Sequence, residues 1–120
     1  MHTAILGTDF HNVSLDILEK LYFDKNRIKS FHDSLPQNVP ASEWVILSTC
    51  NRMEIYFACE DVETTFQWLV DYLANYCSIP SDVLNKVSYK MNCHDAVNHL
   101  FHVAAGTKSM VYGETEILGQ

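Results

Sequence analysis

The sequence predicts an α+β fold, a ferredoxin-like split β-α-β sandwich in which a four-stranded, mainly antiparallel sheet carries helices on one face. Segments with strand and helix patterns follow one another in the order strand, helices, strand, strand, helix, strand, helix. Apolar residues alternate in the strand-like segments and recur at helical spacing in the others. At 48% hydrophobic residues, 120 residues are enough for one core. We therefore expect one domain over residues 1–120.

The first third of the chain predicts a strand and two helices. Residues 3–6 form an apolar run that closes on Gly7, Thr8 and Asp9, which is typical of a strand entering a turn. Ser14 is a suitable N-cap for a helix whose leucines recur at helical spacing. A second helix is expected over 25–35, and the prolines within 36–40 indicate the loop that ends it.

The middle of the chain predicts a hairpin followed by a long helix. Residues 44–47 form a continuous apolar run, and residues 53–57 alternate apolar and polar side chains, which is typical of a strand with two different faces. The short connection between them favours a hairpin. Asp61 can cap a helix over 62–76, whose apolar residues keep the spacing of an amphipathic face.

The last third predicts a fourth strand and a further helix. Residues 87–91 alternate like a strand, and residues 94–105 show a helical stripe that ends at Gly106, a suitable C-cap. We expect a loop over 107–113. Residues 114–120 resemble the first turns of another helix and stop without a C-terminal signal, so we expect a domain boundary inside a longer protein.

Composition excludes several classes of protein. The chain has 8 Lys and Arg against 15 Asp and Glu, a net charge of −7, which does not fit a basic nucleic-acid-binding module. No apolar run reaches the roughly 18 residues of a membrane helix, and no leader pattern opens the chain. We expect a cytoplasmic protein that does not bind a membrane.

The four cysteines are scattered and favour reduced thiols over disulfides. They form no C-x-x-C pair, and the histidines at 94, 99 and 102 do not match a metal-binding pattern, so no metal site is expected. Cys59, Cys77 and Cys93 are interpreted as small buried hydrophobes. Cys50 differs because it lies in a polar loop between two strands, two residues before Arg52, and a nearby cation favours the reactive thiolate.

Two blocks of sequence carry a family resemblance. The first is Ser-Thr-Cys-Asn-Arg-Met-Glu-Ile-Tyr over 48–56. The second is His-Leu-Phe at 99–101, followed by Val-Ala-Ala-Gly at 103–106, Ser-Met-Val at 109–111, Gly-Glu at 113–114 and Ile-Leu-Gly-Gln at 117–120. In order and spacing both blocks resemble the N-terminal catalytic domain of glutamyl-tRNA reductases. A weaker similarity over 7–23 extends the resemblance to essentially the whole chain.

The resemblance implies a thiol mechanism. Cys50 matches the nucleophile that attacks the ester of glutamyl-tRNA to form a glutamyl thioester. NADPH then reduces the thioester to glutamate-1-semialdehyde, the precursor of tetrapyrroles, porphyrins and haem. His99, which the helical pattern places off the core stripe, matches the active-site histidine, with a role in positioning or in proton delivery to the leaving ribose hydroxyl.

The resemblance also implies a set of substrate-binding residues. Arg52 matches the residue that grips the glutamate carboxylate, for which a planar guanidinium is well suited. The remaining positions are Thr49, Asn51, Ser109, Glu114 and Gln120. Asn51 is alternatively a residue that shapes the turn. Glu54 belongs to the signature and is expected on the polar face of its strand.

The chain departs from the family pattern at some positions. Asp9-Phe10-His11 replaces the usual Asn-His-Lys, and Leu18 replaces an Arg. Lys108 and Thr115-Glu116 replace a common acidic residue and a frequent Pro-Gln. Residues 1–120 contain no G-x-G-x-x-G motif and no expected cofactor site, so the resemblance places NADPH on a separate domain.

The absence of the NADPH-binding and dimerisation domains from this chain affects the activity and the oligomeric state that we expect for it. We expect this chain to form the thioester, or to hydrolyse it slowly, without reducing it, and to be a monomer because the family's dimerisation helices are absent. The whole enzyme is implied to be a homodimer that binds glutamyl-tRNA and is paired with glutamate-1-semialdehyde aminomutase. The negative net charge fits a domain that binds the aminoacyl end of the tRNA and leaves most contacts with the tRNA backbone to other regions.

Two other function classes remain open. One is a catalytically silent ferredoxin-like module in which Cys50 packs and Arg52 binds a ligand carboxylate. The other is a cysteine hydrolase or redox domain, which requires an oriented His and Asp pair or a resolving thiol. Cys59 lies too far along an extended strand to pair easily with Cys50.

Overall fold

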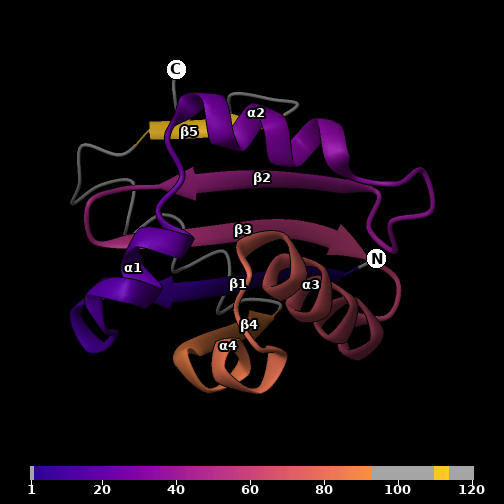
Figure 1. Cartoon of the computed structure of the whole chain (residues 1–120). Helices are drawn as coiled ribbons and strands as arrows, with labels where there is room; N and C mark the ends of the chain where they lie inside the picture. The colour runs from indigo at the N-terminus through magenta and orange to yellow at the C-terminus, as the bar shows by residue number, and fades with distance from the viewer. Residues whose placement is uncertain (1, 93–109, 114–120) are drawn as a thin grey trace.

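The computed structural model describes residues 2–92 and 110–113. Its described strands and helices are β1 (His2–Asp9), the 3-10 turn η1 (Phe10–Asn12), α1 (Leu15–Leu21), α2 (Lys25–Ser34), β2 (Glu43–Ser48), β3 (Arg52–Cys59), α3 (Val62–Cys77), α4 (Ser81–Val87), β4 (Ser88–Asn92) and β5 (Met110–Gly113). In Figure 1 the helices of this part of the chain cover one face of the sheet. None of them has both the length and the apolar character needed to cross a membrane.

The strands form one antiparallel sheet in the order β4-β1-β3-β2-β5. The order of the first four is that of a split β-α-β sandwich, because β3 lies between β1 and β2 and β4 flanks β1. This confirms the predicted α+β class and its antiparallel sheet. β5 pairs with β2 and adds a fifth strand where a loop over 107–113 was predicted.

Local signals explain where the helices begin. Ser14, Asp24 and Asp61 are the N-caps of α1, α2 and α3, and each side chain accepts a hydrogen bond from the backbone N–H three residues later. Each satisfies a backbone donor that the first turn leaves unpaired. Ser78 ends α3 in the left-handed conformation, with φ of 59°.

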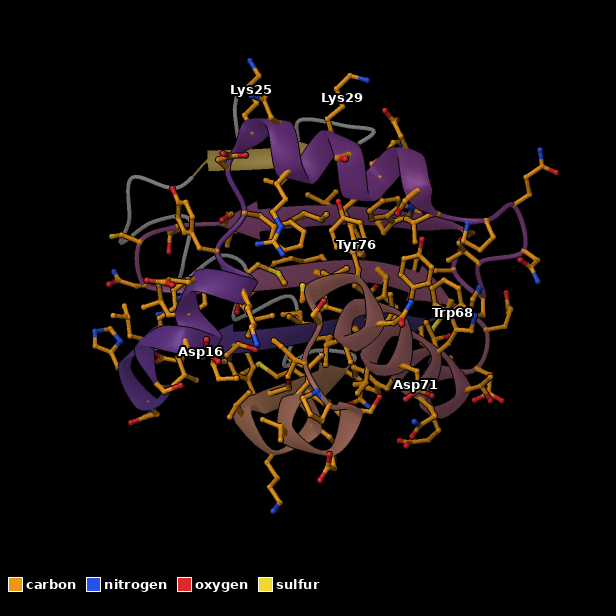
Figure 2. All side chains as sticks on the ribbon, viewed as in Figure 1. Asp16, Lys25, Lys29, Trp68, Asp71 and Tyr76 are labelled. Carbon is orange, nitrogen blue, oxygen red and sulfur yellow. The ribbon has the colours of Figure 1, made fainter. Side chains whose placement is uncertain are left out.

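Alternation along β3 separates two faces of the sheet. Met53, Ile55 and Phe57 point toward the helices and join the main core, while Tyr56 belongs to a smaller cluster with Ile5 and Leu47 on the other face. The main core is rich in aromatic rings. Phe31 from α2 is fully buried, and its ring contacts those of Phe23, Trp44, Tyr72 and Tyr76. Figure 2 shows Tyr76 between α2 and α3, with Lys25 and Lys29 directed away from the sheet.

Three predictions of local structure need correction. β1 does not enter a turn at Gly7 but continues to Asp9, because Gly7 and Thr8 pair with both β3 and β4. Residues 81–87, for which no element was predicted, form α4, and Val87 ends that helix instead of starting β4. The predicted helices over 94–105 and 114–120 lie outside the described residues.

Candidate functional site

The site is built on the turn that joins β2 to β3. The backbone N–H of Thr49 donates to the carbonyl of Arg52 at 2.9 Å and closes the turn. The Thr49 hydroxyl oxygen accepts hydrogen bonds from the backbone N–H groups of Asn51 and Arg52, at 3.0 and 3.1 Å. A side chain that replaces the backbone as acceptor is a common way to fix a tight turn. Cys50 stands at the outside of this turn, exposed to solvent.

Contacts on both sides hold the turn in place. The backbone N–H of Phe10, in η1, donates to the carbonyl of Asn51 at 2.8 Å. The buried hydroxyl of Ser48 donates to the carbonyl of Phe23 at 2.8 Å. Phe10 and Phe23 are both core residues, so the turn is tied to the hydrophobic core. A nucleophile on a turn anchored in this way keeps its position relative to the sheet.

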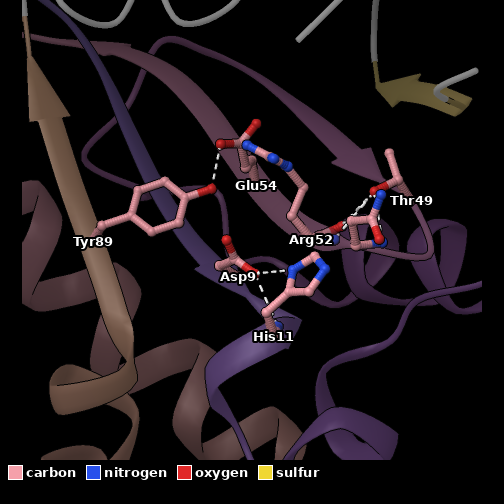
Figure 3. Close-up of polar contacts among 7 residues, drawn as sticks. Asp9, His11, Thr49, Arg52, Glu54 and Tyr89 are labelled. Atoms are coloured by element: carbon pink, nitrogen blue, oxygen red, sulfur yellow. Dashed lines mark hydrogen bonds and ion pairs between the residues drawn. The ribbon is translucent and has the colours of Figure 1, made fainter. Parts of the chain in front are cut away.

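Beside the turn, a buried carboxylate lies on the face of the sheet opposite the helices. Glu54 is fully buried and accepts hydrogen bonds from the Tyr56 hydroxyl, at 2.8 Å, and from the Tyr89 hydroxyl. Burial, with the neighbouring Glu54 charge, raises the pKa of both tyrosines well above the usual 10. Figure 3 shows the Arg52 side chain extending from the turn toward Glu54. The Nε atom of Arg52 is buried and has no hydrogen-bond partner among residues 2–92 and 110–113.

A second polar group lies beside Arg52 at the end of β1, where Asp9 pairs with Arg52 in the sheet. The Asp9 carboxylate accepts a hydrogen bond from the backbone N–H of His11 at 2.9 Å. The same oxygen lies 2.7 Å from Nδ1 of the His11 ring. The backbone and side chain of His11, followed by the charge of Arg52, hold the pKa of Asp9 below its usual 3.8. The pair lies next to Arg52 in Figure 3; the His11 side chain is largely exposed and that of Asp9 is partly buried.

The structure brings together four of the residues predicted for the site: Thr49, Cys50, Asn51 and Arg52. The hydroxyl of Thr49 is used in the hydrogen bonds that hold the turn. Asn51 contributes its backbone, which supports its interpretation as a turn residue. His99, Ser109, Glu114 and Gln120 lie outside the described residues, so their roles stay predictions.

Sequence reasoning misplaced one residue of this region and missed others. Glu54 was expected on a polar face and is instead fully buried. The alternation of β3 correctly places it on the same face as Arg52 and Tyr56, which is the signal that could have grouped the three. Nothing local in the sequence indicates that Tyr89 reaches them, because it lies 35 residues from Glu54 and two strands away.

The other described cysteines fit the interpretation of buried hydrophobes. Cys59 and Cys77 are free thiols in the main core. Burial raises the pKa of the Cys77 thiol to about 11, against the opposing effect of the Arg27 guanidinium, whose Nη2 lies 3.6 Å from its sulfur. Among these three cysteines, Cys50 alone is exposed and therefore open to a substrate. Cys93 lies outside the described residues.

The described residues do not fit a dinucleotide. Gly7 and Gly113 are the glycines among them, and both lie within strands, so this part of the chain holds no glycine-rich turn leading into a helix. Within the same ranges no three His, Cys, Asp or Glu residues are grouped to hold a metal ion. A hollow of about 420 Å³ lies between the loop before β2 and the start of α3, at the end of the hairpin away from Cys50.

Chemically, the turn presents an exposed thiol on a rigid support, and Arg52 follows it two residues later at the start of β3. A thiol in this setting can attack an activated acyl carbon, and a guanidinium fork can bind a carboxylate. Acyl transfer from a substrate that carries a free carboxylate is the chemistry that both groups fit.

Comparison with known proteins identifies relatives across the chain. The family model "Glutamyl-tRNAGlu reductase, N-terminal domain" matches residues 6–120. The glutamyl-tRNA reductases of Carboxydothermus hydrogenoformans, Shouchella clausii and Bacillus subtilis are 37%, 38% and 35% identical to the chain, each match covering all of it. The chain spans about a quarter of their length, 26% to 27%.

Proposed function

The chain belongs to the glutamyl-tRNA reductase family, whose N-terminal domain it matches, and we propose that it carries the acyl-transfer half of that reaction. The observation that carries the proposal is the position of Cys50. It is exposed at the outside of a hydrogen-bonded turn, within the block that resembles the family signature. The substrate is glutamyl-tRNA, presented by its aminoacyl end.

In the proposed step, the thiolate sulfur of Cys50 attacks the carbonyl carbon of the ester between glutamate and the terminal ribose. A carbon–sulfur bond forms, the carbon–oxygen bond to the ribose breaks, and the ribose oxygen takes up a proton. The product is a glutamyl thioester on Cys50. An aminoacyl ester is already activated, so a soft, well-placed nucleophile suffices.

The proton for the leaving ribose is assigned to His99, on the family resemblance. General-acid assistance of this kind is typically worth about 10²- to 10⁴-fold in rate. Ser109, Glu114 and Gln120 are proposed, on the same grounds, to contact the substrate. These assignments rest on the position of each residue in the second sequence block.

Arg52 is proposed to bind the free side-chain carboxylate of the glutamyl group. Its position two residues after Cys50 places a cation beside the acyl acceptor, and its Nε has no partner among the described residues. The guanidinium can offer two parallel N–H donors to a carboxylate, which fixes orientation as well as charge. The ester end of the same glutamyl group would then face the thiol.

Reduction of the thioester to glutamate-1-semialdehyde, on the route to tetrapyrroles, is proposed for the whole reductase. NADPH is the reductant that the resemblance implies, and it would supply the hydride when bound. Because the described residues do not fit a dinucleotide, we assign its binding to the portion of the relatives that this chain does not match. No step described for Cys50 or Arg52 depends on it.

The test is the formation of a covalent adduct without reductant. The chain is incubated with tRNA carrying labelled glutamate, and the intact mass is measured before and after mild hydroxylamine, which cleaves thioesters. We expect a glutamyl adduct that Cys50→Ser abolishes. Cys77→Ala is the matched control, because it removes a thiol that is buried in the core and should leave the adduct unchanged.

Two results would argue against the proposal. One is an adduct that persists in Cys50→Ser. The other is no adduct on a folded chain whose Cys50 still reacts with iodoacetamide. That second result would mean that this chain does not carry the acyl-transfer step.

A further inference from the structure

One row of residues crosses the sheet beside the Cys50 turn. Tyr89 on β4 pairs with Gly7 on β1, and Gly7 pairs on its other side with Glu54 on β3. The Tyr89 hydroxyl nevertheless donates directly to Glu54, across the strand that separates them. The ring therefore crosses over β1 at the position of Gly7.

Glycine is what makes this crossing possible. A Cβ at position 7 would lie 2.7 Å from Cζ and 2.8 Å from the hydroxyl oxygen of Tyr89, closer than real Cβ contacts allow. β1 is a central strand paired on both sides, so its backbone cannot move aside easily. The Tyr89 ring therefore occupies the space above Gly7, and its hydroxyl donates to Glu54 from there.

Glu54 in turn shapes the surroundings of Arg52. Its carboxylate has both oxygens engaged by tyrosine hydroxyls, and the charge of Arg52 acts on Tyr56 and Tyr89. The Arg52 guanidinium lowers the pKa of Tyr89 against the larger opposing effects of burial and of Glu54. A fully buried carboxylate is costly unless it is paired and hydrogen-bonded, so these contacts hold one another in place.

A guanidinium has five N–H donors in one plane, and contacts on one edge fix the direction of the others. Figure 3 shows the guanidinium directed toward Glu54, and its buried Nε has no hydrogen-bond partner among residues 2–92 and 110–113. A long arginine side chain without such neighbours would sample many rotamers. Fixing it before the substrate arrives lowers the entropy lost when a carboxylate binds.

We propose that Gly7, Glu54, Tyr56 and Tyr89 are positioning residues that orient Arg52 for a carboxylate, and so set the preference for an acidic acyl group. The inference rests on the proposed function of Arg52 and extends it to residues that do not touch the substrate. Tyr89 and Gly7 link β4 and β1 to the turn, so the selectivity of the site depends on three strands.

The test compares Tyr89→Phe and Gly7→Ala with wild type. The first removes the hydroxyl, and the second leaves it present but displaces the ring, so neither changes the charge of the site. Tyr72→Phe is the matched control, because it removes a tyrosine hydroxyl that bonds Ser34 on the helical side. Glu54→Gln is a further variant, and Tyr89→Phe keeps the inference testable should that one fail to fold.

Two readouts are measured. The first is the ratio of Cys50 acylation rates with glutamyl-tRNA and with tRNA charged with neutral glutamine. We expect this ratio to fall about tenfold in both variants, the value of one charge-assisted hydrogen bond. Alkylation of Cys50 by iodoacetamide should stay unchanged. A purely structural role would lower stability without moving the ratio.

The second readout is the NMR signal of the Arg52 Nε–H group, which does not require activity. We expect slow side-chain motion in wild type and Tyr72→Phe, and fast motion in Tyr89→Phe and Gly7→Ala. Arg52 that stays rigid in both variants would overturn the inference, as would an unchanged ratio. If wild type forms no adduct at all, the proposed function fails, while the Nε–H signal still decides whether these residues orient Arg52.

Discussion

Replacing Thr49 with valine tests how the Cys50 turn is held. Valine keeps the shape and β-branching of threonine but removes the oxygen that accepts from the backbone N–H groups of Asn51 and Arg52. Each hydrogen bond contributes roughly 0.5–1.5 kcal/mol net. Three are lost, counting the long 3.4 Å bond that the hydroxyl donates to the Arg52 carbonyl, and water can replace part of them, so we expect the free energy of unfolding to fall by about 1–2 kcal/mol.

The assay is urea unfolding followed by tryptophan fluorescence. Thr49→Ser is the informative companion, because it keeps the acceptor oxygen and should recover most of the lost stability. Thr3→Val makes the same change at an exposed strand position, where we expect less than about 0.5 kcal/mol. The reasoning is refuted if Thr49→Val matches wild type, or if Thr49→Ser is as unstable as Thr49→Val.

Three further predictions concern the core, the helix caps and the thiols. Phe31→Ala empties a fully buried site lined by aromatic rings and should lower the free energy of unfolding by about 3–5 kcal/mol, measured by urea denaturation. The backbone N–H of Thr64 lowers the pKa of Asp61 below 3.8, so its stabilisation is present above that pH and is lost as pH falls through the lower, folded-state value. Thermal unfolding of Asp61→Asn, which keeps a capping side chain, should therefore depend less on pH in the acid range than wild type does. Iodoacetamide should modify Cys50 in the folded chain, while Cys59 and Cys77 react only at the rate of unfolding, as peptide mapping would show. Equal rates for the three thiols would contradict their placement.

Much of the fold could be predicted because its signals are local. The N-caps Ser14 and Asp61 and the alternation of β3 act within a few residues, and the structure has them where the sequence placed them. The strand β5 escaped prediction because four residues carry little pattern of their own, and pairing with β2 supplies their hydrogen bonds. Gly7 was interpreted as a turn signal, although pairing on both sides keeps it within a strand.

The sequence by itself determined the nucleophile candidate, the strand that carries Arg52 and the family. These depend on residues that are neighbours in the chain, where spacing and motif are directly visible. Only the tertiary structure decided that Glu54 is buried and that Tyr89 reaches it across Gly7. The physical reason is that a buried carboxylate depends on hydrogen-bond donors that strand pairing brings together from distant parts of the chain.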